Sequence, residues 1–175
     1  PLAPNKRVDI AVEAFNSIDL PLIVIGSGQE EKKLEKMAGK NIKLMGWQSD
    51  EIVREHYVNC KALIFPGVED FGIVPLEAQA CGKPVIAFGE GGALETIIPL
   101  DKNIVNNNAT GLFFHEQTAE SLAQVVVRFE DVQAQFNGQA IRKNAESFDR
   151  VMFKDEFKKY IEKEYKEFRQ NLQDK

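Results

Sequence analysis

Two short apolar runs, at residues 62–65 and 85–88, flank a loop and a short helix, and this unit constrains the fold more than any other part of the chain. Both runs have the composition of buried strands, and a Pro-Gly break at 66–67 ends the first. Pro75 suits a first helical position because its missing N–H costs nothing there, and Gly82 is a natural helix stop. The segment is therefore predicted to be a strand, a loop, a helix and a second strand parallel to the first.

The rest of the chain alternates in the same way between apolar runs and amphipathic stretches. Asn5 can cap a helix whose apolar residues Val8, Val12 and Phe15 fall on one face. This alternation predicts an α/β fold, a doubly wound parallel sheet with helices on both faces. A chain of 175 residues can bury roughly 70% of its unfolded surface, so one domain is expected. Further strands are predicted at 20–25, 42–45 and 112–114, further helices near 29–38 and 50–59, and a helical C-terminal part after Thr118.

The composition argues against several classes of protein. A net charge of -5 disfavours binding to nucleic acid, which needs a basic surface. No apolar run approaches the roughly 18 to 20 residues of a membrane-spanning helix, and no signal-peptide pattern is found at the start. Cys60 and Cys81 lack any metal-binding spacing, so we interpret them as reduced thiols of a cytoplasmic protein.

The last predicted helix carries a long aromatic stripe at helical spacing. From the residues alone, the favoured interpretation of this stripe is ordinary packing into the core. The polar tail after Phe168 is predicted to fray. The stripe consists of Phe153, Phe157, Tyr160, Ile161, Tyr165 and Phe168.

A ligand site is predicted where the strand at 62–65 ends, because the following loop holds Glu69 and Asp70. In doubly wound sheets ligands bind beyond the carboxyl ends of the strands, and the N–H groups of a helix start can hold an anion. Lys6 and Arg7 are expected in the first turn of their helix, where each positive charge costs about 0.3 to 1 kcal/mol against the macrodipole. A phosphate bound there would explain this misfit, and a solvated Lys-Arg pair is the alternative.

A second candidate phosphate loop contains Gly26 and Gly28. The string GSGQEEK lacks the third glycine of G-x-G-x-x-G, so a simple tight turn is favoured. The missing fingerprint also disfavours an oxidoreductase.

The string EDFGIVPLEAQACGKPVIA, followed by GGALET at 91–96, resembles the C-terminal, donor-binding domain of retaining glycosyltransferases with the GT-B fold, family 4 or group 1. The family signature is two glutamates eight positions apart, here Glu69 and Glu77. The resemblance covers nearly the whole chain and is strongest to bacterial mannosyltransferases of polysaccharide assembly. It implies a Rossmann-like half of a GT-B enzyme.

The resemblance also implies roles for individual residues. Lys6 would bind phosphate, Glu77 the ribose hydroxyls and Glu69 hydroxyls of the transferred sugar. Trp47 and Gln48 fall where family members contact the base, although Trp47 could equally be a packing aromatic. The implied donor-binding residues are Lys6, Arg7, Trp47, Gln48, Glu69, Phe71, Gly72, Ile73, Val74 and Glu77, with Lys6 and Glu69 as the catalytic residues and no metal ligand.

The implied reaction is transfer of a hexose, mannose from GDP-mannose being favoured, to a glycan or lipid-linked acceptor with retention. The nucleotide sugar is a substrate, and no cofactor is expected. N–H groups and Lys6 would stabilise the charge that develops on the leaving diphosphate. Glu69 could be taken for a nucleophile, as in retaining glycosidases. The resemblance favours reaction on the donor's front face instead.

Three features of the family pattern are not found in the sequence. Family members have a first strand before the segment at 1–6 and an arginine where Pro1 stands, and their acceptor site lies in a separate N-terminal domain. Neither His56 nor His115 matches the histidine of that domain, so both are predicted to be structural or solvated. The isolated domain is expected to be inactive, and the full enzyme to be cytoplasmic, with peripheral association at the inner face of the membrane.

Other functions stay open. Sugar-nucleotide epimerases and phosphorylases also use GT-B domains, and a non-catalytic nucleotide-sugar-binding module would retain affinity without turnover. In GT-B enzymes the last helix crosses back toward the other domain, which is a second explanation for the aromatic stripe.

Overall fold

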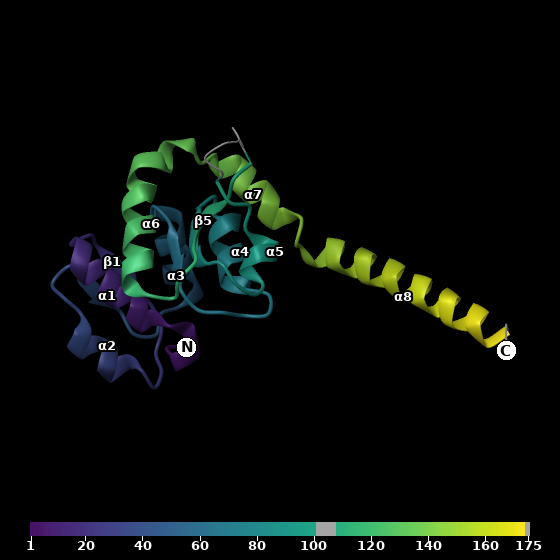
Figure 1. Ribbon diagram of the computed structural model, residues 1–175, viewed down its shortest axis with the longest axis horizontal. Coiled ribbons are helices and arrows are strands. Elements are labelled where there is room, and N and C mark those ends of the chain that lie inside the picture. Colours follow the sequence, from purple (N-terminus) through teal and green to yellow (C-terminus); the bar gives the residue numbers. More distant parts are fainter. Residues whose placement is uncertain (101–107, 174–175) are drawn as a thin grey trace.

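The computed structural model describes residues 1–100 and 108–173, in which five parallel strands alternate with helices (Figure 1). Strands β1 (Leu22–Val24) and β2 (Ile42–Leu44) pair with each other. Strands β3 (Leu63–Phe65), β4 (Val85–Phe88) and β5 (Gly111–Phe114) form a second group in the order β3-β4-β5. The predicted α/β fold with parallel strands is confirmed. The strands nevertheless pair as two separate sheets, because β1 and β3 share no hydrogen bonds.

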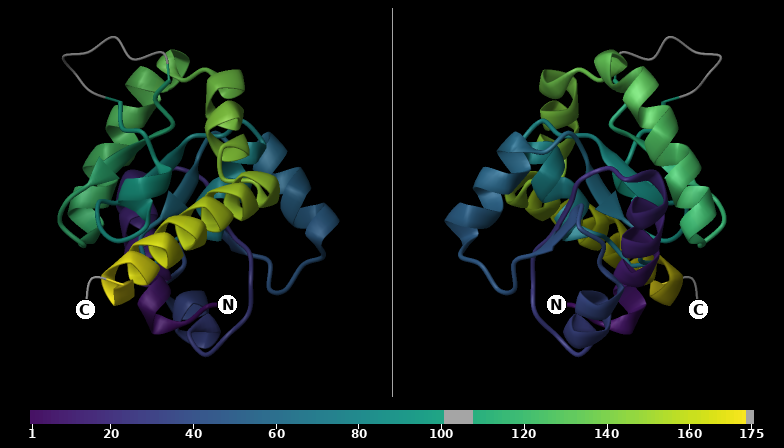
Figure 2. Two further views of the ribbon diagram at one scale, coloured as in Figure 1. Left: turned by 90° about the vertical axis from the view of Figure 1, so that its right-hand side faces the viewer. Right: turned by 90° about the vertical axis from the view of Figure 1, so that its left-hand side faces the viewer.

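Helices cover both faces of the β3-β4-β5 sheet, as predicted (Figure 2). Successive side chains of a strand point to opposite faces, and β4 shows this directly. Ile86 and Phe88 belong to the large core cluster that includes α1 (Val8–Ile18) and α6 (Ala119–Val132). Val85 and Ala87 belong to a second cluster with Ala78 of α4 (Ile73–Ala80). All four residues of β4 are buried, as expected for a strand covered twice.

The chain start differs from the prediction. Residues Pro4–Lys6 form a 3-10 turn, η1, and the N-cap of α1 is Arg7, which has a left-handed conformation (φ 50°). The prediction that Asn5 caps the helix is therefore wrong, as is the placement of Lys6 and Arg7 in its first turn. A proline at the start of η1 favours the short turn, and the left-handed Arg7 then redirects the chain into α1.

The remaining helices include those predicted near 29–38 and 50–59, after the strand at 62–65 and after Thr118. They are α2 (Glu31–Met37), α3 (Asp50–Asn59), α4, α5 (Ala93–Thr96), α6, α7 (Gly138–Glu146) and α8 (Arg150–Gln173), with a short 3-10 turn, η2 (Gln133–Gln135), after α6. Helix α4 begins at Ile73, so Pro75 is its third residue and not its first. Gly82 has a positive φ of 73° after the α4 C-cap, which confirms the predicted helix stop.

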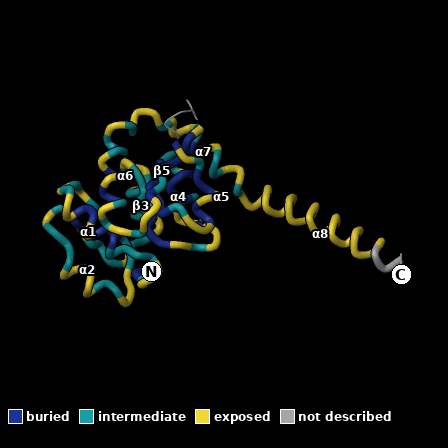
Figure 3. The backbone as a smooth tube through the Cα atoms, in the orientation of Figure 1, coloured by how far each residue is buried: buried dark blue, intermediate teal, exposed yellow. Residues whose placement is uncertain are grey.

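Helix α8 extends away from the rest of the molecule (Figure 1), and residues 150–170 are all exposed (Figure 3). Phe153 and Tyr165 are 63% and 60% exposed. The prediction that the stripe packs into the core is therefore wrong. Helical periodicity shows which face of a helix is apolar, but it does not show what lies against that face.

No helix of the described ranges is both long and apolar enough to cross a membrane.

Candidate functional site

The loops that follow β3, β4 and β5 meet at the carboxyl edge of the sheet, where the sequence predicts a ligand. The Gly92 N–H donates to the Glu69 carbonyl at 2.8 Å, and the Gln117 side chain donates to the Pro66 carbonyl at 2.9 Å. A Cβ on Gly92 would lie 2.5 Å from the Asp70 carbonyl oxygen, so only glycine allows this approach. The loop that carries Glu69 is thus fixed from two neighbouring loops.

The two predicted catalytic residues are in contact. The Lys6 ammonium forms an ion pair with Glu69 Oε1, and both side chains are only partly exposed, at 28% and 23%. Gly67 permits this contact, because a Cβ there would lie 2.8 Å from the Asn5 carbonyl oxygen. The structure therefore brings together a cation and a carboxylate from segments that are far apart in sequence.

Arg7 is held beside this pair by two partners. Its Nε donates to Asp9 at 3.3 Å and its Nη1 to Gln117 at 3.0 Å. Gln117 therefore links the start of α1 to the β3 loop, a role that no sequence motif predicted. The one signal for it is its place just beyond a predicted strand, at the same edge as Glu69.

Glu77 is an exposed residue in the second turn of α4, and its Oε2 accepts a hydrogen bond from the Tyr57 hydroxyl at 3.2 Å. A phenol is protonated at neutral pH, and burial, followed by the charge of Glu77, raises the pKa of Tyr57 further. Tyr57 was not predicted from the sequence, because nothing in a helix pattern reveals a partner 20 positions away on the next helix.

The start of α4 presents the other predicted donor-binding residues at the surface. Gly72 is the N-cap with a left-handed conformation (φ 85°), and α4 begins at Ile73. The side chains of Phe71, Ile73 and Val74 are 43%, 65% and 39% exposed. The start of α4, shortly after Glu69 in the chain, gives this edge further positive potential for an anion.

Trp47 and Gln48 lie in the loop after β2, a strand of the other sheet. Trp47 is 75% exposed, so the alternative that it packs into the core is wrong. Gln48 Nε2 donates to the Met45 carbonyl at 2.7 Å. Within the described residues, no hydrogen bond joins either side chain to Lys6 or Glu69. Their contact with a base stays a prediction.

The N-terminal segment packs against the turn that contains Gly26 and Gly28. The Leu2 N–H donates to the Ser27 carbonyl at 2.9 Å, and a Cβ on Gly28 would lie 2.5 Å from the Leu2 carbonyl oxygen. The glycines therefore serve a close backbone contact, which agrees with the favoured interpretation as a tight turn.

Both histidines lie outside the contacts described above. His56 Nδ1 is 2.8 Å from the Ile52 carbonyl oxygen on its own helix, and His115 is exposed. These positions agree with the prediction of structural or solvated residues. In the part of the chain that the structure describes, no three His, Cys, Asp or Glu side chains group closely enough to hold a metal ion.

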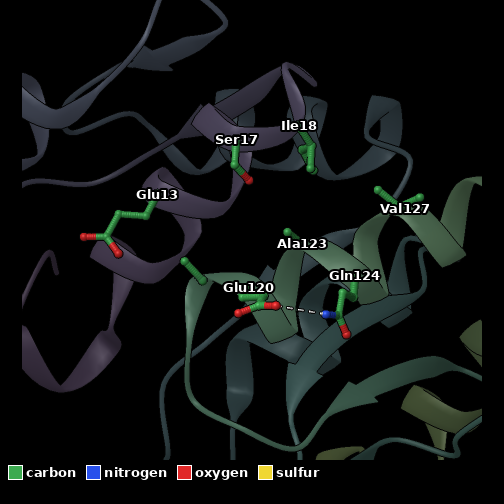
Figure 4. A pocket seen from close by; sticks show the side chains of 8 residues that line it. Glu13, Ser17, Ile18, Glu120, Ala123, Gln124 and Val127 are labelled. Atoms are coloured by element: carbon green, nitrogen blue, oxygen red, sulfur yellow. Dashed lines mark hydrogen bonds between the residues drawn. The ribbon is translucent and has the colours of Figure 1, made fainter.

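An open hollow of about 570 Å³ lies between α1 and α6 (Figure 4). It is lined by Ser17, Ile18, Ala123 and Val127, among others, and none of the predicted donor-binding residues contributes to it. We therefore assign it no part in the site.

The comparisons with known proteins identify the family. The sequence model for glycosyl transferases group 1 matches residues 1–148. The chain belongs to this family. A GDP-mannose-dependent phosphatidylinositol monomannoside mannosyltransferase of Corynebacterium glutamicum is 31% identical over 146 residues, which cover 74% of the chain and 36% of that protein. The chain spans about a third of the length of the curated relatives that it matches.

Solved structures of other proteins show the same fold. A glycosyltransferase from Rickettsia africae is 25% identical with a TM-score of 0.75, over 92% of the chain and 45% of that protein. Anabaena HepE, solved with UDP-glucose, is 22% identical with a TM-score of 0.71, over 93% of the chain and 46% of HepE. Both match the chain to a little under half of a larger protein, and these likenesses confirm the predicted Rossmann-like GT-B fold.

Proposed function

We propose that this group 1 glycosyltransferase chain is the donor-binding part of an enzyme that transfers a hexose from a nucleoside diphosphate sugar. The observation that carries the proposal is the meeting of Lys6 and Glu69 at the carboxyl edge of the sheet, beside the start of α4. In this proposal Lys6 and the N–H groups of Gly72 and Ile73 hold the diphosphate. Glu69 binds hydroxyls of the sugar, and Glu77 binds the ribose.

The Lys6–Glu69 ion pair fits both roles. An ammonium donates three hydrogen bonds, and a carboxylate accepts through two oxygens, so each group can keep its partner while it contacts the donor. As the glycosidic bond breaks, negative charge grows on the diphosphate, and fixed donors stabilise that charge. The acceptor hydroxyl would attack the anomeric carbon from the same face that the diphosphate leaves, so the sugar would keep its configuration without a covalent bond to Glu69.

The donor is proposed to be GDP-mannose. Support comes from the Corynebacterium relative, whose name gives GDP-mannose as its donor. HepE, a more distant neighbour, binds UDP-glucose. The loop with Trp47 and Gln48 would contact the base, and the exposed Trp47 ring offers it a stacking surface.

A strand that precedes residue 1 is proposed to pair between β1 and β3. Leu2 contacts Ser27 just beyond β1, and Asn5 approaches Gly67 just beyond β3, so the chain passes between the ends of these strands. Each of the two strands pairs along one edge only within the described residues. A sixth parallel strand at this place would join the two sheets into one.

The remaining parts of the proposal concern the whole enzyme. An N-terminal acceptor domain would close over the donor, and the exposed stripe of α8 would pack against it. The acceptor would be a glycan or a lipid-linked sugar, at the inner face of the cytoplasmic membrane.

Calorimetric titration with GDP, GDP-mannose, UDP and UDP-glucose tests the donor site. We expect saturable binding of the guanosine pair, weakened in Glu77→Ala by about 1.5 to 3 kcal/mol through loss of charged hydrogen bonds. Lys6→Ala should weaken GDP far more than guanosine. Glu164→Ala, which removes an exposed carboxylate from α8, is the matched control. Binding of none of the four ligands would contradict a donor site in this chain.

A non-catalytic nucleotide-sugar-binding module is the second candidate. The Lys6–Glu69 pair could bind the nucleotide sugar without an acceptor domain or an acceptor substrate. The two candidates differ in the complete protein: the transferase consumes the donor when an acceptor is present, and the module does not.

A further inference from the structure

We propose that Tyr57 is a positioning residue for Glu77, whose carboxylate it orients for the ribose of the bound nucleotide. The inference rests on the proposed function, and it adds a residue from α3 to a site proposed on η1, the loop after β2, the β3–α4 loop and α4.

The structure places a rigidly held hydroxyl group, that of Tyr57, beside the exposed side chain of Glu77. The Tyr57 ring is half-buried and packs against the cluster that contains Phe65 and Ala78, which fixes the position of its hydroxyl. That hydroxyl donates to Glu77 Oε2 at 3.2 Å. Among the hydrogen bonds and ion pairs of the described residues, this is the one contact of the Glu77 side chain. Glu77 itself is exposed on α4, so no packing holds its carboxylate in place.

This arrangement suits recognition of a vicinal diol. A carboxylate that accepts one hydrogen bond keeps a second oxygen and further lone pairs for two hydroxyl groups. An exposed glutamate without a partner samples several rotamers, and binding then has to order it. A hydrogen bond from the fixed Tyr57 hydroxyl orders the carboxylate before the ligand binds, and so lowers the entropy cost of binding. Tyr57 should therefore strengthen binding of a ribose diol and leave the other parts of the donor unaffected.

Tyr57→Phe is the variant that isolates this effect, because it removes the hydroxyl and keeps the ring in its packing. We would measure the dissociation constants of GDP and of its 2′,3′-dideoxy analogue for the parent chain, Tyr57→Phe, Glu77→Ala and the double variant. Tyr160→Phe is the matched control, since it removes a hydroxyl from an exposed tyrosine on α8.

We expect Tyr57→Phe to weaken GDP binding by about 3- to 10-fold and to leave the dideoxy analogue nearly unchanged. In the Glu77→Ala background the same substitution should have no further effect, because the group that it orients is gone. A purely structural role would weaken both ligands equally and would persist without Glu77.

The outcomes separate the two proposals. If the parent chain binds GDP and Tyr57→Phe binds it equally well, or loses both ligands in the same proportion, the positioning role is wrong and the donor site stands. If the parent chain binds neither GDP nor UDP, the proposed function itself is overturned and this inference falls with it. Thermal unfolding of Tyr57→Phe serves as the check that the fold is intact.

Discussion

The β3–α4 loop and helix α8 differ in opposite directions in two properties, regular secondary structure and contact with the rest of the fold. The loop has little regular structure, yet hydrogen bonds from Gly92 and Gln117 and the ion pair of Lys6 fix its backbone and Glu69. Helix α8 is regular over Arg150–Gln173 and exposed along the part whose side chains are described. Local i,i+4 pairs such as Lys163–Glu167 at 3.8 Å support it, each worth a few tenths of a kcal/mol. A segment can therefore have regular secondary structure without tertiary contacts, and in this chain it is the irregular loop that tertiary contacts hold in place.

The strongest test of this contrast is Gly92→Ala. The new methyl group would lie 2.5 Å from the Asp70 carbonyl oxygen and from Phe71 Cα, so the backbone of the loop must shift. We expect a loss of about 1 to 3 kcal/mol in the free energy of unfolding, measured by urea denaturation, with weaker nucleotide binding. Leu94→Ala, at an exposed position on α5, is the control. An unchanged free energy of unfolding would show that the loop is not held closely against Gly92.

A smaller effect is expected where the two regions approach each other. Phe148, just before α8, packs edge-on against Phe71 in the loop, with ring centroids 6.0 Å apart. Phe148→Ala should cost about 0.5 to 1.5 kcal/mol and raise the hydrogen exchange of the loop amides. Phe148→Leu retains apolar contact and should cost less. Equal exchange in all three proteins would mean that the aromatic pair does not restrain the loop.

The smallest effect is expected on α8. The double variant Phe157→Ser and Tyr160→Ser replaces rings that are 54% and 58% exposed, so stability should change by less than about 0.5 kcal/mol. The measurement is urea denaturation of the chain alone. A loss above about 1 kcal/mol in the free energy of unfolding would show that the stripe packs against another surface in solution. If that loss depended on protein concentration, the surface would belong to a second copy of the chain.

The sequence predicted the order of strands and helices because each has a local signal, either an apolar run, a helical period or a Pro-Gly break. It predicted the meeting of Lys6 and Glu69 only through resemblance, since no local pattern joins residues 63 positions apart. The failures have the same cause. The surroundings of the α8 stripe, the partners Tyr57 and Gln117 and the left-handed Arg7 all depend on what the folded chain places nearby.

The separation between Lys6 and Glu69 has a consequence for how the molecule assembles. Contacts between distant segments form only after a large loss of chain entropy, so they tend to close late in folding. An intermediate that contained only β3, β4 and β5 would hold Glu69 and Glu77 without Lys6, and Arg7 would not yet have met Gln117, 110 positions away. The cation of the proposed site therefore comes from outside the β3–β5 unit, and the site is complete only when the N-terminal segment is in place. A ligand that requires it recognises only the completed fold and stabilises that fold by mass action.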